Sequence, residues 1–145
     1  MANLSFEKRQ LCDIQGRLFE LSFKNGYDSF EFIKAFMNSR AAVSLDDTYD
    51  RLQWAGEEYI LEELVEETGG LKKAGILYPM EVMYWTGYTY RFWHYYMNES
   101  SQEIYKIVDG RIMNECFPGF HTLDVEMAVD NLKEIYLQNC STDSF

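Results

Sequence analysis

Arginine and histidine side chains lie three positions apart in the segment RFWH, as Arg91 and His94. In a helix turning about 100° per residue, both side chains and Gly87 fall within roughly 60° of one another. A histidine can exchange protons near neutral pH, and an arginine can hold a carboxylate through two hydrogen bonds. A glycine leaves room for another backbone or a ligand to approach closely. This helix face is therefore the first candidate site.

Carboxylates that can partner this face lie in the acidic segment after residue 45. If residues 46–68 form one helix, Asp50 and Glu57 project onto its apolar side, where an unpaired carboxylate is costly. Arg91 and His94 are the natural partners. Three interpretations stay open: a buried arginine–carboxylate pair that fixes helix packing, a polar pocket in which Glu57 and His94 act as acid and base, or a polar contact surface.

Other catalytic patterns are weak. Cys116 and His121 lie five positions apart, so a thiolate–imidazole pair is chemically possible, but a buried structural thiol is the simpler interpretation. With Cys12 and Cys140, the three cysteines contain no CxxC pair, which fits reduced thiols better than disulfides or a zinc site. The chain also lacks a phosphate-binding glycine loop, HExxH and GxSxG. We expect no metal, no cofactor and no enzymatic activity.

The net charge of −11 is concentrated in one segment. Residues 46–67 hold nine acidic residues and one basic residue, Arg51. Because nucleic acids are bound largely through lysine and arginine, we expect no direct nucleic-acid binding. An acidic surface instead favours a protein partner with a basic surface, through long-range attraction. The candidate partner-binding residues share the polar side of the expected helix: Glu58, Glu62, Glu63 and Glu66.

The elements that must position these residues read as helices along almost the whole chain. We expect helices over residues 6–24, 30–37 after the cap Asp28, 46–68 before Gly69, 79–98 from Pro79, about 101–107 after the cap Ser100, and 125–137, with Asp109-Gly110 as a turn. No strand-like alternation is evident. The fold class is therefore all-α, a single compact domain over residues 1–145 with about five to seven helices and a disordered tail at 139–145.

Residues 84–96, YWTGYTYRFWHYY, carry eight aromatic side chains that point in all directions from a helix axis. A helix that is apolar all round is normally central and buried, so we expect this helix to form the core. A small-ligand pocket and a stacking platform for bases are the alternatives. Buried tyrosine and tryptophan polar atoms will need hydrogen-bond partners around this helix.

The chain shows no signal-peptide pattern and no apolar run long enough for a membrane span. We expect a cytoplasmic protein without membrane association, and the oligomeric state stays open.

The segments YDRLQWAGEEYILEEL, YPMEVMYWTGYTYRFWHYY, SSQEIYK and FHTLDVEMAVDNLKEIY resemble a family of small helical proteins of Firmicutes and their mobile elements. The resemblance covers residues 49–136. Genes of that family lie near toxin–antitoxin-like modules, which implies an antitoxin-like or defence-associated protein that binds and regulates a protein partner. No catalytic motif of that family can be assigned to particular residues of this chain. The alternatives are a mobile-element inhibitor that mimics phosphates with its acidic side chains, and a small enzyme with a pocket of Glu57, Arg91 and His94.

Overall fold

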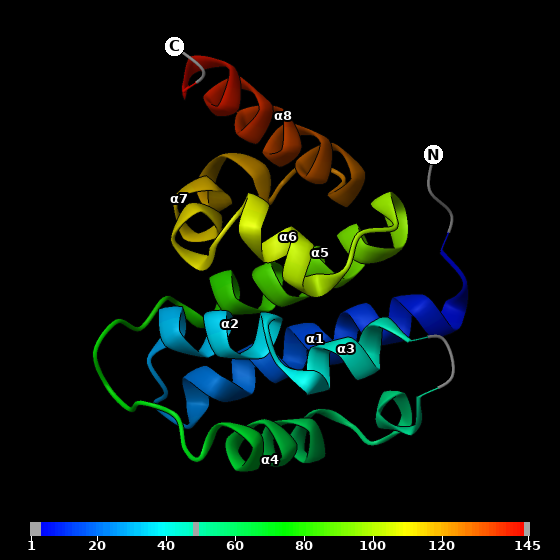
Figure 1. Ribbon diagram of the computed structural model, residues 1–145, viewed down its shortest axis with the longest axis vertical. Helices are drawn as coiled ribbons and strands as arrows, with labels where there is room; N and C mark the ends of the chain where they lie inside the picture. Colours follow the sequence, from blue (N-terminus) through cyan, green and yellow to red (C-terminus); the bar gives the residue numbers. More distant parts are fainter. Residues whose placement is uncertain (1–3, 48–49, 144–145) are drawn as a thin grey trace.

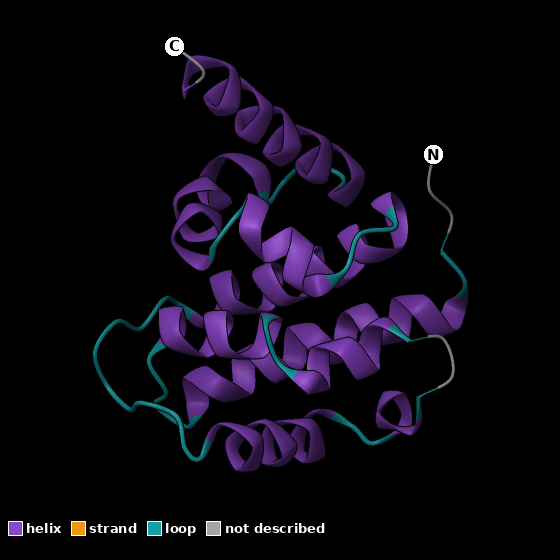
Figure 2. Ribbon diagram, viewed as in Figure 1, coloured by secondary structure: helices purple, strands orange, loops and turns teal. Residues whose placement is uncertain are grey.

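The computed structural model describes residues 4–47 and 50–143, and within these ranges the chain consists of helices joined by loops (Figures 1 and 2). The α-helices are α1 Phe6–Lys24, α2 Ser29–Met37, α3 Arg40–Asp46, α4 Glu57–Thr68, α5 Met80–Met97, α6 Ser101–Ile107, α7 Gly110–Phe120 and α8 Val125–Asp143, with a short 3-10 helix, η1, at Arg51–Trp54. The expected all-α class is confirmed, although these described residues form slightly more helices than expected. None of the described helices has the length and apolar character of a membrane span.

The central pair of the fold is α1 and α5, which pack against each other more extensively than any other two described elements. Two glycines permit this approach. A Cβ atom on Gly87 would lie 2.5 Å from the carbonyl oxygen of Gln15, and one on Gly16 would lie 2.7 Å from the ring of Tyr84. The close backbone approach expected at Gly87 is thus made by α1, and not by a ligand.

The aromatic-rich helix α5 lies in the core, as expected. Tyr90, Phe92 and Trp93 are each at most 4% exposed. The polar side-chain atoms of Tyr90 and Trp93 have partners within the fold. The Tyr90 hydroxyl donates to the carbonyl of Val108 at 2.7 Å, and Trp93 Nε1 donates to a carboxylate oxygen of Glu99 at 2.9 Å. The interior of the domain is therefore built around this helix.

The acidic segment differs most from its expected form. The prediction of one helix over residues 46–68 is wrong, since α3 ends at Asp46 and α4 begins only at Glu57. Gly56 adopts a φ of +85°. This value lies outside the right-handed helical range, and glycine tolerates it better than any other residue. Between the two helices, the side chain of Asp50 caps η1 by accepting from the amide of Leu52 at 2.8 Å. Trp54, the last residue of η1, is 77% exposed.

Two further boundaries are corrected. Asp109 and Gly110 do not form only a turn, because the Asp109 side chain accepts from the amide of Ile112 at 3.0 Å and caps α7. The last helix continues to Asp143, so residues 139–143, expected in a disordered tail, are helical. The sequence of this stretch contains no glycine or proline, so nothing in it ends the helix after Leu137. The remaining tail residues, 144–145, lie outside the described residues.

Candidate functional site

Arg91 lies on the inner face of α5, is 1% exposed, and uses its three guanidinium nitrogens in separate hydrogen bonds. Nη1 donates to Asp46 Oδ1 at 2.6 Å, Nε to Gln15 Oε1 at 2.8 Å, and Nη2 to Ser101 Oγ at 3.2 Å. These bonds connect α5 to α3, α1 and α6. We refer to these four residues as the Arg91 cluster. An arginine with every nitrogen occupied by the protein acts as a clamp between helices.

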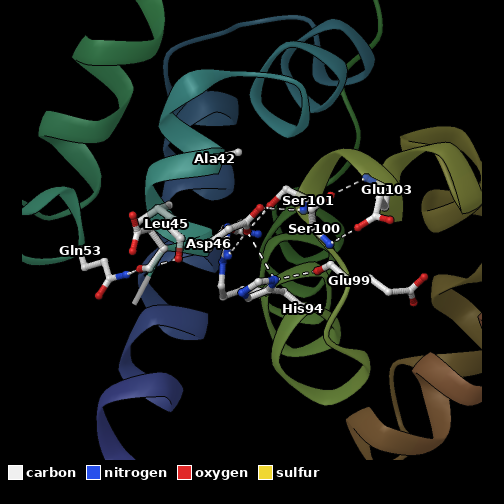
Figure 3. A network of polar contacts seen from close by, with 12 residues as sticks. Ala42, Leu45, Asp46, Gln53, His94, Glu99, Ser100, Ser101 and Glu103 are labelled. Atoms are coloured by element: carbon white, nitrogen blue, oxygen red, sulfur yellow. Dashed lines mark hydrogen bonds and ion pairs between the residues drawn. The ribbon is translucent and has the colours of Figure 1, made fainter. Parts of the chain in front are cut away.

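Asp46, the last residue of α3, is the acceptor at the centre of this cluster (Figure 3). Besides Arg91, its carboxylate accepts from the amide of Ser101 at 2.9 Å and from the Ser101 hydroxyl at 2.7 Å. One carboxylate thereby joins the end of α3 to the start of α6 and to α5. Each buried polar side-chain atom of the Arg91 cluster has a partner, which is the condition for such a network to stabilise a fold.

His94 borders the Arg91 cluster one turn further along α5. Its Nδ1 lies 2.7 Å from the carbonyl oxygen of Glu99 and 3.6 Å from Asp46 Oδ1. A carbonyl oxygen can only accept, so Nδ1 carries the hydrogen and Nε2 is the acceptor of the neutral ring. Burial, and next the charge of Arg91, lower the pKa of His94 below its ordinary value, against the opposing effects of Glu99 and Asp46. His94 is therefore a neutral base near pH 7.

The expected pairing of Arg91 with Glu57 or Asp50 is wrong. Glu57 Oε1 lies 3.9 Å from Arg17 Nε on α1, and Asp50 caps η1. The expectation assumed a helical register through residues 50–57, and the break before α4 removes it. An arginine–carboxylate clamp does exist, but Asp46 provides its carboxylate.

Sequence reasoning also missed two members of the Arg91 cluster. Gln15 is a polar residue on the apolar side of α1, and its fully buried side chain both accepts from Arg91 and donates to the carbonyl of Gly87 at 2.9 Å. A polar residue on the apolar side of an amphipathic helix indicates a buried polar contact, and this signal could have identified Gln15. Ser101 follows the helix cap Ser100, and nothing in its local sequence indicates a buried contact.

Glu57 and His94 nevertheless line one groove, which we call the α1–η1 groove. It lies between the outer face of α1, the segment around η1 and the last turn of α5, and has a volume of about 670 Å³. Leu11, Ile14, Trp54 and Tyr95 supply apolar wall. Asp46 also reaches the groove, whereas Arg91 lies behind it. The groove thus unites two of the four residues expected in a polar pocket.

The predicted partner-binding residues lie together on α4, and all four are exposed: Glu58, Glu62, Glu63 and Glu66. No ion pair between described residues reaches any of them. Glu67 has a different role, because its carboxylate accepts from the amides of Arg40 and Ala41 at the start of α3. We call the four exposed glutamates the α4 acidic face.

A second hollow, of about 850 Å³, adjoins the α4 acidic face between α3, η1 and α4. Glu63, Glu66 and Asp50 line it together with the exposed ring of Tyr59. The Tyr59 hydroxyl hydrogen-bonds to Glu63, and this contact is the main cause of the raised pKa of Tyr59. The acidic surface is therefore concave on one side and carries an aromatic ring within it.

The remaining candidate groups are not activated for catalysis. Burial raises the pKa of the Cys12 thiol to about 12 and also raises the pKa of Cys116. The ring of His121 stacks on Phe117 at 4.2 Å and its Nδ1 contacts the Phe117 carbonyl. A reactive cysteine needs a lowered pKa, so the Cys116–His121 spacing does not describe a nucleophile. Among the described residues, no group of three potential ligands can hold a metal ion.

No family model, curated protein or solved structure matches the chain. The two surfaces that remain for a functional argument are the α4 acidic face and the α1–η1 groove.

Proposed function

We propose that the protein is a non-enzymatic interaction module, antitoxin-like or defence-associated, that binds and regulates a protein partner through the α4 acidic face. The observation that carries this proposal is the set of four exposed glutamates on one helix that make no ion pair within the described chain. Like charges at helical spacing repel one another, so a basic partner surface would relieve a destabilising arrangement.

The hollow beside this face supports a partner that contributes arginine or lysine side chains. Tyr59 is 49% exposed and stands beside the carboxylates of Glu63 and Glu66. Aromatic rings and carboxylates together favour a cation, because the ring face attracts it and the carboxylate pairs with it. We infer a cytoplasmic location, since the free thiols of Cys12, Cys116 and Cys140 suit a reducing compartment.

A related function uses the same surface. If the partner is a nuclease of the host of a mobile element, the carboxylates of the α4 acidic face would occupy its basic cleft in place of nucleic-acid phosphates. Such an inhibitor would bind competitively with nucleic acid, whereas an antitoxin-like regulator need not. A competition assay on the captured partner separates these two forms of the proposal.

A small enzyme is the second candidate function, favoured by one observation: Glu57 and His94 line the same groove, and His94 is a neutral base with Nε2 as acceptor. Arg91 does not support this function, because the protein itself occupies all of its donor nitrogens. The groove presents no activated nucleophile and no metal ligand set among the described residues. The binding proposal is therefore preferred.

Affinity capture from a lysate of the source cell tests the proposal, with three forms of the protein. These are the wild type, a variant with Glu62→Lys and Glu66→Lys, and a control with Glu115→Lys and Glu134→Lys, which makes the same charge change on exposed positions of α7 and α8. Figure 1 shows α8 at the far end of the molecule from α4. We expect the wild type and the control to capture the same stoichiometric basic protein, and the α4 variant to lose it. Equal capture by all three forms would refute the role of the α4 acidic face, and a retained metabolite with no protein partner would favour the enzyme.

A further inference from the structure

The α1–η1 groove combines an apolar wall with acceptor groups, and this combination is independent of the α4 acidic face. Leu11 and Ile14 come from α1, Trp54 from η1 and Tyr95 from α5, so three elements distant in sequence build the apolar side. Trp54 is 77% exposed, a costly arrangement for the largest apolar side chain unless something covers it. A volume of about 670 Å³ lies in the range of small-molecule sites.

Two basic side chains, Lys8 and Arg17, line the groove, and both contact aromatic or acidic groups. The ammonium nitrogen of Lys8 stands 5.2 Å from the ring centroid of Tyr95, a cation–π distance. Arg17 Nε lies 3.9 Å from Glu57 Oε1 and 3.1 Å from Asp13 Oδ2. Lys8 is thus held by the Tyr95 ring and Arg17 by Asp13, whereas the 3.9 Å contact with Glu57 is too long for a hydrogen bond and leaves that carboxylate able to accept one. The positions of Lys8 and Arg17 leave acceptors, not cations, as the groups available to a ligand.

Three residues with acceptor atoms line the groove: Asp46, Glu57 and His94. In neutral His94, Nδ1 donates to the carbonyl of Glu99, so Nε2 offers a lone pair, and no other described residue donates a hydrogen bond to it. Asp46 also lines the groove, with Oδ1 at 3.6 Å from His94 Nδ1, although its carboxylate already accepts from Arg91 and Ser101. Glu57 adds a second carboxylate, whose side chain is 26% exposed. An ionised carboxylate and the unprotonated nitrogen of a neutral histidine accept hydrogen bonds and cannot donate.

We propose that the α1–η1 groove binds a small organic cation, an ammonium or amidinium group carried on a flat or short apolar body. The cationic group would donate to Glu57 and to His94 Nε2, and the body would lie against Ile14, Trp54 and the ring of Tyr95. Binding displaces Lys8 from the face of Tyr95 and returns its ammonium group to water. The ligand is recognised by charge and by apolar contact together, so neither a simple metal cation nor an aromatic acid meets both requirements. This inference stands whether or not the α4 acidic face binds a partner.

Isothermal titration of the full chain at low salt tests this proposal, with phenethylamine and benzamidine as probes and 3-phenylpropionate as an anion of matched shape. We expect saturable one-to-one binding of at least one cation, at least about tenfold tighter than the anion, since a charge-assisted hydrogen bond contributes about a tenfold factor or more. Absence of saturable binding by both cations up to about 10 mM, which is weaker than the affinity of useful small-ligand sites, would overturn the proposal. Equal affinity for cation and anion would also overturn it.

Matched variants locate the site. Glu57→Gln is expected to weaken cation binding about tenfold, while Glu58→Gln, next in sequence but outside the groove, leaves it unchanged. Trp54→Ala should weaken binding and Tyr59→Ala, an exposed aromatic outside the groove, should not. Lys8→Met should tighten binding, because it removes the internal competitor for Tyr95. If Glu58→Gln or Tyr59→Ala weakens binding as much as its partner variant, the ligand binds elsewhere and the groove assignment is wrong. The α4 charge reversals would leave this binding intact, so failure of one proposal does not count against the other.

Discussion

Nη1 of Arg91 lies 2.6 Å from Oδ1 of Asp46, which joins the middle of α5 to the last residue of α3, 45 positions earlier in the chain. Both side chains are largely out of solvent, at 1% and 13% exposed. Removing one member leaves the other charged and unpaired inside the protein, and such a loss typically costs about 3–5 kcal/mol.

We therefore expect Arg91→Met to destabilise the protein by roughly 3–5 kcal/mol in urea unfolding. Adding Asp46→Asn should recover a substantial part of that loss, because the uncompensated carboxylate is gone and the new side chain can still accept from Ser101. Glu57→Gln is the control, and it should cost less than about 1 kcal/mol since its contact with Arg17 is long and half-exposed. Strictly additive effects of the two cluster substitutions would contradict the pairing.

The sequence predicted an arginine–carboxylate clamp at Arg91, but it did not predict that Asp46 provides the carboxylate. A buried arginine near His94 on an aromatic helix calls for a carboxylate, and that inference is correct. The choice among carboxylates depended on a helix through residues 46–68, but the chain is extended at Asp47 and Asp50 and has positive φ at Gly56, so no single helix spans this segment. Whether a glycine interrupts a helix or is tolerated within it depends on tertiary contacts, which local pattern does not contain.

The helix caps predicted from residue spacing are confirmed, because a cap depends only on neighbouring residues. The caps Asp28 and Ser100 accept from the amides three residues later, at 2.9 and 3.1 Å, and Ser100 with Glu103 forms the complete capping box. Capping depends only on four neighbouring residues, so sequence can predict it. The α1–η1 groove, by contrast, is assembled from three elements far apart in sequence, and no spacing along the chain indicates that Trp54 and His94 line one surface.

His94 should make stability depend on pH. Burial and Arg91 lower its pKa in the folded state, whereas in the unfolded chain histidine titrates near 6.5. As the pH falls below about 6.5, the unfolded chain takes up the proton first, so stability decreases with falling pH until the folded pKa is passed. The groups that face the ring are Arg91, Asp46, the Glu99 carbonyl and the Tyr95 ring.

Urea unfolding between pH 7.5 and 5 measures this dependence. His94→Gln should remove a slope of no more than about 1.4 kcal/mol per pH unit, while His121→Gln, at the other and exposed histidine, should keep it. Identical pH profiles for the wild type and His94→Gln would show that His94 is not held neutral.

Gly87 should tolerate no side chain. Alanine would place its Cβ 2.5 Å from the carbonyl oxygen of Gln15, and the two helices would have to separate. We expect Gly87→Ala to destabilise the protein by about 1–3 kcal/mol or more in urea unfolding, as overpacking does. Gly119→Ala is the matched control, because a Cβ there meets nothing within 4 Å in α7, and it should be neutral or stabilising by up to about 1 kcal/mol. A stabilising Gly87→Ala would show that α1 and α5 are not in close contact.

The α4 acidic face should control the rate at which the partner binds. Glu62→Lys together with Glu66→Lys should slow association with the captured partner, because exposed charges mainly steer the encounter. The effect should shrink as salt rises, since the Debye length falls from about 10 Å at 0.1 M to about 3 Å at 1 M. Thermal stability should stay within about 0.5 kcal/mol of the wild type, because both side chains are exposed and make no ion pair with a described residue.

Stopped-flow association at low and high salt checks this expectation, with Glu115→Lys and Glu134→Lys together as the control of equal charge. That control changes the net charge by the same amount but lies on α7 and α8, so its association rate should fall much less. If the α4 variant associates at the wild-type rate in low salt, its glutamates form only a solvated helix face and do not guide a partner. If both variants slow association equally, net charge steers the encounter and the position of the glutamates on α4 has no special role.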